Sequence, residues 1–450
     1  MLITNANVIT WEEPNRILEN YALYIAGGRI ADVGPQLELT DRYPDEQRLD
    51  AHSQYVMPGN ICAHTHFYGT FSRGLAIPGS PPTEFPEILQ KLWWPLDKSL
   101  TLDDIRCSVQ FCLIDAIRHG TTALIDHHAS PNAIPGSLDV IAEEVEQAGL
   151  RAVLCYEVTD RDGEDKTNAG IQENIRFIDR IAMQSSPDRR LAATFGLHAS
   201  LTLSDTTLDR CRTAVPDEIG FHIHVAEHEA DQYDSLAKSG LRIVDRLYQH
   251  NLLGPHSIAA HAVHVDAREI ALLAETATWV THQPRSNMNN AVGVAPVESM
   301  LRAGVKVCLG NDGFSNALWE EWKTAYLIHK VWNRDPRRMP GTDVVRMGAY
   351  NNAALLHTFF PLAPIGVIKP GAYADLIFVD YPPPTPVTPD NLPWHILFGF
   401  NESMVTTTMV AGQVLMQDRQ LLTIDPGEVS TRARLLVPGV WKRFQKSSPK

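Results

Sequence analysis

NICAHTH, residues 60–66, is an apolar β-type run that ends in two histidines spaced by two residues. Side chains at positions i and i+2 project from the same face of a strand, so His64 and His66 are expected to point the same way. Seven similar runs follow, each separated from the next by a segment long enough for a helix. They are TTALIDHH (121–128), LRAVLCYEV (150–158), LAATFGLHA (191–199), GFHIHVAE (220–227), SIAAHAVHV (257–265), TWVTHQP (278–284) and KVCLGNDG (306–313).

This alternation of strands and helices predicts an α/β fold. The amphipathic segments LDVIAEEVEQAG and REIALLAET lie between strand candidates and end at glycine or polar caps. Eight such units favour a (β/α)8 TIM barrel over residues 58–360. The rival is a doubly wound open sheet, which usually carries a glycine-rich phosphate loop after its first strand, and the sequence has none there.

The two ends of the chain have a different pattern. Residues 1–57 read as short strands with a tight hairpin at Gly27-Gly28, and residues 361–425 repeat this style with a turn at Gly412. We therefore expect one small composite β-sandwich domain built from both termini. The remaining segment, 426–450, is predicted to be a C-terminal helix and tail.

Composition limits the possible partners. The chain has 450 residues, of which 44% are hydrophobic, and a formal net charge of −14, which argues against binding a polyanion such as nucleic acid. No run approaches about 18 consecutive apolar residues, so no membrane association is expected. The first residues lack the charged and apolar regions of a signal peptide, and the six cysteines form no C-x-x-C pair. Both features favour a cytoplasmic enzyme with reduced thiols.

Ligand-type side chains gather at the ends of the predicted strands, where barrel enzymes build their active sites. Taken singly, each has an ordinary explanation, because a buried histidine usually packs and an aspartate before glycine usually caps a turn. Their occurrence at several strand ends instead indicates a site for a divalent cation. The residues are His64, His66, His222, His224, Glu227, His261, His282 and Asp312.

Such a donor set suits one divalent ion per subunit, with zinc preferred and iron(II), manganese or cobalt as alternatives. A catalytic ion lowers the pKa of a bound water from 15.7 towards about 7, which provides a hydroxide to attack an electron-poor carbon. Glu227 follows a candidate ligand by three residues and is placed to protonate the leaving nitrogen. His261 is placed to polarise the substrate.

The motifs PGNICAHTH, GFHIHVAEH, IAAHAVH, HQPRSNMN and LGNDGFSNA resemble, in order and spacing, the amidohydrolase superfamily. The similarity is greatest to the mononuclear branch of SsnA-type aminohydrolases, triazine hydrolases, S-adenosylhomocysteine/methylthioadenosine deaminases and molinate or phenylurea hydrolases. The resemblance implies that His64, His66, His224 and Asp312 bind the metal and that Glu227, His261 and Asp312 are catalytic. It also implies a structural role for His222 and for His264.

The resemblance further implies a single metal ion. Binuclear members bridge two ions with a carboxylated lysine at the end of the fourth strand, and that strand here reads TFGLHAS. The same comparison suggests a homodimer or higher homo-oligomer. The predicted substrate contacts are His198, His282 and Asn287, together with Phe67, Arg73 and Trp93 from the aromatic loop over residues 67–100.

Several reactions fit this site. Hydrolytic deamination of an amino-substituted heterocycle by a metal-bound hydroxide is favoured, because it uses Glu227, His261 and Asp312 together. Cleavage of an amide, phenylurea or thiocarbamate bond and dechlorination of a triazine stay open, and so does a non-catalytic barrel that serves as a scaffold. Loops change the specificity of a barrel without changing its metal ligands, so the sequence does not name the substrate.

Overall fold

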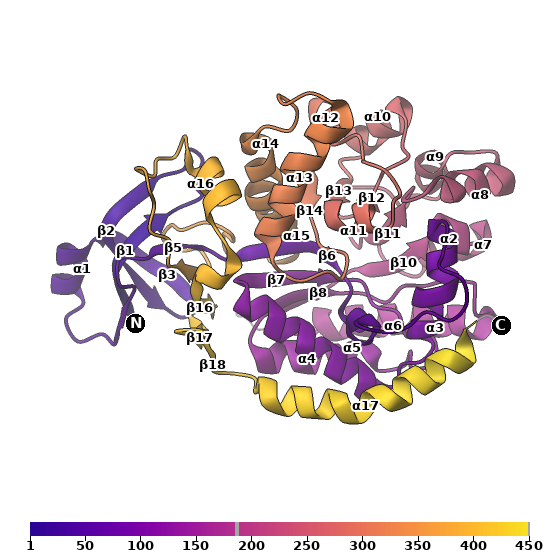
Figure 1. Cartoon of the computed structure of the whole chain (residues 1–450), viewed down its shortest axis with the longest axis horizontal. Helices are drawn as coiled ribbons and strands as arrows, with labels where there is room; N and C mark the ends of the chain where they lie inside the picture. The colour runs from indigo at the N-terminus through magenta and orange to yellow at the C-terminus, as the bar shows by residue number, and fades with distance from the viewer. Residues whose placement is uncertain (185–188, 449–450) are drawn as a thin grey trace.

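The computed structural model describes residues 1–184 and 189–448 and contains two parallel sheets and one mixed sheet. The first parallel sheet has the order β6-β7-β8-β9 and the second β10-β11-β12-β13-β14, and Figure 1 shows both within the helical part of the molecule. Their strands are β6 Asn60–Thr65, β7 Thr121–Asp126, β8 Arg151–Leu154, β9 Leu191–Ala193, β10 Phe195–Ala199, β11 Phe221–Val225, β12 Ile258–His261, β13 Trp279–His282 and β14 Val307–Leu309.

Every one of the eight predicted strand segments contains a strand. The segment 191–199 holds two, β9 and β10, separated only by Thr194. Backbone N–H of Thr194 donates to Leu154 O at 3.2 Å, and its hydroxyl donates to Gly220 O at 2.9 Å, so this residue links the neighbouring strands on both sides. Together with the helices between the strands, this arrangement is a TIM-barrel-type α/β fold.

The last parallel strand approaches the first. After β14, the backbone N–H groups of Asn311 and Asp312 donate to His64 O in β6 at 2.9 and 3.1 Å. Gly310 lies against the same residue, and a Cβ placed there would be 2.7 Å from His64 N and O. Only a residue without a side chain allows the two backbones to come this close.

Helices follow the strands, as the apolar periodicity predicts. Two of them begin at a capping box: Thr101 and Asp104 form one at the start of α4, and Asp266 and Glu269 form another at α10. The α-helices of this part are α2 Phe85–Ile88, α3 Trp94–Asp97, α4 Leu102–Arg118, α5 Ser137–Ala148, α6 Glu164–Ala182, α7 Asp205–Thr213, α8 Glu229–Ser239, α9 Ile243–Gln249, α10 Ala267–Glu275, α11 Pro284–Asn289, α12 Val297–Arg302, α13 Leu318–Asn333, α14 Gly341–Val345 and α15 Asn352–Phe359. Short 3-10 or π-helical segments are η1 Phe67–Ser72, η2 Leu89–Trp93, η3 Ser200–Thr202 and η4 Arg346–Asn351.

The two ends of the chain meet in the mixed sheet, and the predicted sandwich packing of their strands stays a prediction. Nine strands form a single sheet, ordered β18-β17-β16-β15-β5-β1-β2-β3 with β4 beside β1. The reason is the central strand β5, which pairs in parallel with β1 and antiparallel with β15 and so joins the two ends edge to edge. The strands are β1 Leu2–Ile9, β2 Ile17–Ala26, β3 Arg29–Pro35, β4 Arg48–Asp50, β5 Tyr55–Pro58, β15 Leu376–Val379, β16 Val405–Val410, β17 Gln413–Gln417 and β18 Gln420–Leu421.

The C-terminal region contains more helix than expected. Helix α16, Leu392–Gly399, lies within the segment predicted to be β, and the smaller helices α1 Gln36–Arg42 and η5 Glu402–Met404 flank strands of the mixed sheet. The predicted final helix is confirmed as α17, Pro426–Ser447, which runs along α4 and α3 (Figure 1). Within residues 1–184 and 189–448, no helix combines the length and the apolar character needed to cross a membrane.

Candidate metal centre and active site

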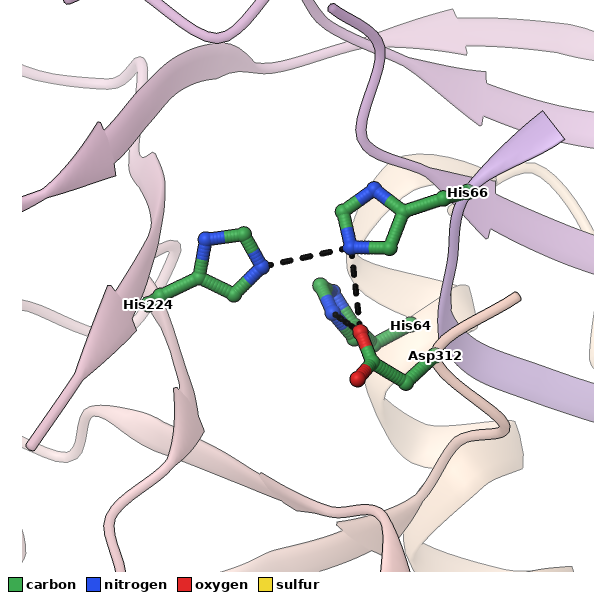
Figure 2. A group of neighbouring side chains, drawn as sticks. All are labelled: His64, His66, His224 and Asp312. Atoms are coloured by element: carbon green, nitrogen blue, oxygen red, sulfur yellow. Dashed lines mark hydrogen bonds and ion pairs between the residues drawn. The ribbon is translucent and has the colours of Figure 1, made fainter. Parts of the chain in front are cut away.

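Four side chains from three strand ends converge at one point, as Figure 2 shows. His64 and His66 come from the end of β6, His224 from β11 and Asp312 from the segment after β14. One ligand atom of each lies within 4.8 Å of the others. Asp312 Oδ1 is 3.0 Å from Nε2 of His64 and from Nε2 of His66, and Nε2 of His224 is 3.3 Å from Nε2 of His66.

Hydrogen bonds on the far side of two rings fix their orientation. Nδ1 of His66 donates to His127 O at 2.6 Å, and Nδ1 of His224 donates to His198 O at 2.8 Å. With the proton on Nδ1, the lone pair of Nε2 points inward, towards Asp312. Imidazole nitrogens and a carboxylate oxygen are ligands that zinc and similar divalent ions accept, so the donor set fits such an ion.

A second layer of polar groups lies beneath these ligands. His222, expected to be structural, is fully buried, and its Nε2 is 2.8 Å from Nδ1 of His64. Glu157 was not singled out from the sequence, yet its Oε1 lies 3.3 Å from Nδ1 of His66 and 3.4 Å from Nδ1 of His127. Burial alone would raise the pKa of Glu157, but the hydrogen bond with His66 and the neighbouring histidines lower it to about 2. Its position near the end of the predicted third strand was the available signal.

Unusual backbone conformations accompany the site. Ala226, His261 and Asp312 have φ values of 49°, 72° and 54°, in the left-handed region that residues with a side chain rarely adopt. Two side chains hold this geometry: Asp231 Oδ2 accepts from Ala226 N at 3.0 Å, and Gln283 Oε1 accepts from His261 N at 3.2 Å. Strain of this kind persists only where surrounding contacts over-determine it, which is common at active sites.

Glu227 and His261 lie next to the candidate metal ligands. Oε2 of Glu227 is 3.5 Å from Nε2 of His261, and Oδ2 of Asp312 is 3.9 Å from the same nitrogen. The amide nitrogen of Asn287 donates to Nδ1 of His261 at 2.9 Å, which leaves the ring proton on Nε2, facing both carboxyl groups. Burial lowers the pKa of His261 well below its usual value, so the ring is neutral.

The two carboxyl groups have opposite electrostatic surroundings. Burial and the nearby Asp312 charge raise the pKa of Glu227 well above its usual value. Burial also opposes ionisation of Asp312, but the histidines around its carboxyl group, His261, His64 and His66, outweigh it and hold the Asp312 pKa well below its usual value. The surroundings therefore favour the neutral form of Glu227 and the charged form of Asp312.

A cavity opens directly above these groups. His66, His224, Glu227 and Asp312 form part of its floor, and Trp93 and His198, both predicted as substrate contacts, line it. Most of the wall is apolar and was only partly anticipated from the aromatic loop. The wall includes Tyr68, Phe85, Leu89, Trp94 and Phe314.

The other four predicted substrate contacts lie elsewhere. Asn287 supports His261 from behind, and Phe67 is fully buried, with its N–H donating to Asp126 Oδ1 at 2.7 Å. Nε2 of His282 lies 3.3 Å from Nε2 of His329 in α13, and Arg73 is exposed on its loop. None of these four residues lines the cavity, so their contact with a substrate stays a prediction.

The sequence also did not single out two residues of α11 and its end. Ser286 Oγ donates to Asp312 Oδ2 at 2.5 Å, and Asn290 Nδ2 donates to Glu227 Oε1 at 3.2 Å. Both line the cavity. Their only sequence signal was membership of the HQPRSNMN segment or its immediate continuation.

Comparisons with known proteins agree with this geometry. The sequence model of the Amidohydrolase family matches residues 55–415. A 5'-deoxyadenosine deaminase from Methanosarcina barkeri is 34% identical over 439 residues, which cover 96% of both chains. A 5-methylthioadenosine/S-adenosylhomocysteine deaminase from Syntrophobacter fumaroxidans is 33% identical over 441 residues, which cover 97% of both.

Solved structures show the same fold. An adenosine deaminase from Xanthomonas campestris with bound zinc has a TM-score of 0.85 at 24% identity, over 99% of this chain and 98% of that one. An atrazine chlorohydrolase from Arthrobacter aurescens complexed with zinc has a TM-score of 0.80 at 21% identity, over 97% of this chain and 100% of that one. The chain therefore belongs to the amidohydrolase family and is an enzyme that hydrolyses carbon–nitrogen bonds other than peptide bonds.

Proposed function

We propose that this enzyme hydrolytically deaminates the aminopurine ring of an adenosine-type nucleoside. The observation that carries the proposal is the set formed by Glu227, His261 and Asp312, which face one another beside the convergent histidines. Replacing an amino group by oxygen requires a group that accepts a proton from water and another that delivers a proton to nitrogen. The names of relatives that match nearly the whole chain, deaminases of 5'-deoxyadenosine and of 5-methylthioadenosine/S-adenosylhomocysteine, support this substrate class.

We further propose that His64, His66, His224 and Asp312 hold one divalent ion, most simply zinc. The inward-facing Nε2 atoms and the carboxylate oxygen support this assignment, as does the zinc in related structures. When bound, the ion supplies Lewis-acid activation of water for attack on an electron-poor carbon.

The protein side chains then move the protons. Asp312 lines the cavity, and its Oδ2, which lies near Ser286 and His261, accepts a proton from the attacking water. Glu227, which burial keeps protonated, donates from Oε2 to the substrate nitrogen, so that ammonia leaves. Nε2–H of His261 stabilises charge on the substrate as the ring is attacked. The apolar wall of Tyr68, Trp93 and Phe314 excludes water and provides faces on which a flat ring stacks.

Ammonia release tests the proposal. The zinc-loaded protein is incubated with 5'-deoxyadenosine, 5'-methylthioadenosine, S-adenosylhomocysteine, adenosine and guanine, with a triazine and a phenylurea as non-nucleoside comparisons. We expect stoichiometric ammonia and the matching hypoxanthine product from at least one adenosine-type substrate. Cleavage of the phenylurea or dechlorination of the triazine, without ammonia from any purine, would show that the substrate class is wrong.

We also propose an architecture that positions this site. The hydrogen bonds from Asn311 and Asp312 to His64 support closure of the parallel strands into an eight-stranded barrel over residues 58–360. Residues 1–57 and 361–425 then form the composite β domain and 426–450 the C-terminal helix and tail. The pairing of β5 with both β1 and β15 supports this division. The homodimer or larger assembly stays a prediction, which light scattering on the purified enzyme tests.

A further inference from the structure

Ser286 and Asn290 connect the two carboxyl groups of the site through hydrogen bonds. Ser286 Oγ donates to Asp312 Oδ2 at 2.5 Å. Asn290 Nδ2 lies 3.3 Å from Ser286 Oγ and 3.2 Å from Glu227 Oε1. A continuous chain of side chains therefore runs from Glu227 through Asn290 and Ser286 to Asp312.

Each hydrogen bond in this series of side chains has a defined donor and acceptor. The amide nitrogen of Asn290 carries two hydrogens and has no lone pair to accept with, so it gives one hydrogen to Glu227 and the other to Ser286. Ser286 accepts this hydrogen and passes its own to Asp312. The direction of every bond is thus set by Asn290, whose amide nitrogen can only donate.

This direction determines where a proton sits on Glu227. Oε1 already receives a hydrogen from Asn290, and the carbonyl oxygen of a protonated carboxyl group accepts such a bond better than its hydroxyl oxygen does. A protonated Glu227 therefore carries its proton on Oε2, the oxygen 3.5 Å from Nε2 of His261. The transferable proton faces the reacting groups and not the wall of the cavity.

The same series of hydrogen bonds orients Asp312. Ser286 engages Oδ2, while Oδ1 lies 3.0 Å from Nε2 of both His64 and His66. The carboxylate is thus held with one oxygen towards the candidate metal ligands and the other towards the cavity.

We propose that Asn290, acting with Ser286, is a positioning residue that assigns the transferable proton of Glu227 to Oε2 and aligns this carboxyl group with that of Asp312. This inference rests on the proposed deaminase reaction. Asn290 has no direct part in the chemistry. Within residues 1–184 and 189–448, its side-chain hydrogen bonds join it to Asn289, Glu227 and Ser286, and none joins it to a candidate metal ligand or to His261.

Two substitutions separate a hydrogen-bond role from a packing role. Asn290→Asp keeps the size of the side chain but replaces the donor with an acceptor, whereas Asn290→Leu keeps similar bulk and removes all polarity. If Asn290 acts as a donor, kcat falls by about tenfold to a hundredfold in Asn290→Leu and by at least as much in Asn290→Asp, with KM changed by less than about threefold. If Asn290 only fills space, Asn290→Asp is the milder change, and that order would overturn the proposal.

A double-mutant cycle tests whether Asn290 acts through Glu227. In a Glu227→Gln background, Asn290→Leu is expected to cause little further loss of kcat, because the proton that it positions is already gone. Independent, multiplicative losses would contradict the inference. Met288→Ala is the matched control, because Met288 lies in α11 two residues before Asn290, is 52% exposed and does not line the cavity.

Each variant is also measured for zinc content and thermal unfolding, which should match the unsubstituted enzyme. A variant that loses zinc or unfolds early contradicts a positioning role that spares the metal ligands. The unsubstituted enzyme is assayed first: failure to release ammonia from any purine refutes the proposed function, whereas normal turnover by both Asn290 variants refutes only this inference.

Discussion

Glu227 and Asp312 are both acidic residues of one small site, yet their neighbours give them different protonation states. Glu227 is buried close to the Asp312 carboxylate, and these two effects outweigh the hydrogen bond from Asn290 and raise its pKa, so its neutral form is favoured. Asp312 interacts with two histidines and a serine hydroxyl, which favour its charged form. Separation of this kind allows two carboxyl groups to act as acid and base at the same pH.

This difference leads to a prediction for Glu227→Gln. The amide has the same size but carries no transferable proton, so kcat should fall by about a hundredfold to ten-thousandfold while zinc stays bound. Steady-state kinetics and metal analysis of the purified variant measure the two effects. Activity close to that of the unsubstituted enzyme would remove Glu227 from the proton-transfer step.

Asp312→Ala should behave differently, because it removes a ligand atom as well as a proton acceptor. We expect lower zinc content and loss of turnover together, and excess zinc should restore only part of the activity. Zinc titration followed by an ammonia assay measures this. Normal zinc stoichiometry in the variant would place Asp312 outside the metal ligands.

At the scale of elements, the approach of β14 to β6 depends on a single glycine. A Cβ at Gly310 would lie 2.7 Å from His64 N and O, closer than real side chains approach. This contact joins the last strand to the strand that carries two candidate metal ligands. The position of the metal site is thus coupled to how the ends of β14 and β6 meet.

Gly310→Ala should therefore displace His64 and weaken zinc binding as well as stability. We expect a lower unfolding temperature and a higher zinc dissociation constant, measured by calorimetry and by competition with a chelator. Gly439→Ala is the control, because Gly439 lies inside α17, where the added Cβ meets only the end of the Arg443 side chain. A Gly310→Ala protein with unchanged zinc affinity would show that this contact does not hold the site.

Helix α16 is an element whose type the sequence pattern does not determine. The segment LPWHILFG is apolar except for His395, has no clear period and lies between predicted strands, yet it forms helix α16. Short apolar runs of this kind are compatible with either a strand or a buried helix, and packing decides between them. Here Leu397 and Pro393 pack against Gly341 at the start of α14.

At the scale of the whole molecule, one buried ion pair joins the parallel strands to the mixed sheet. Arg151 at the start of β8 is fully buried, and its Nε and Nη2 donate to Asp375 Oδ2 and Oδ1 at 2.9 and 3.1 Å. Its guanidinium also lies 4.3 Å from the ring centroid of Tyr373 and 4.9 Å from that of Phe360. A paired, stacked arginine fixes how the two parts meet.

Removing one partner should therefore be costly. Arg151→Met leaves Asp375 buried without its cation, and we expect a loss of about 3–5 kcal/mol in the free energy of unfolding, measured in urea. The double variant Arg151→Met/Asp375→Leu should recover part of that loss. Arg337→Ala, in an exposed pair with Asp335, is the control and should leave the unfolding midpoint unchanged. Equal midpoints for Arg151→Met and this control would contradict the interpretation.

By itself, the sequence predicted the order and type of the strands and helices over residues 58–360 and four polar side chains that converge in the structure. Apolar periodicity and the H-x-H spacing are local properties, because neighbouring side chains along a strand alternate between its faces whatever the rest of the chain does. The spacing of His64 and His66 therefore predicted a shared orientation that the structure has.

Only the tertiary structure decided which other polar residues belong to the site. His282 ends a strand much as His261 does, yet it faces His329, while Glu157 and Asn290 reach the site from segments with no distinctive motif. The single mixed sheet likewise depends on β5 meeting β15, more than three hundred residues away in the chain. Such contacts depend on how distant backbones pack and align, and no local spacing encodes them.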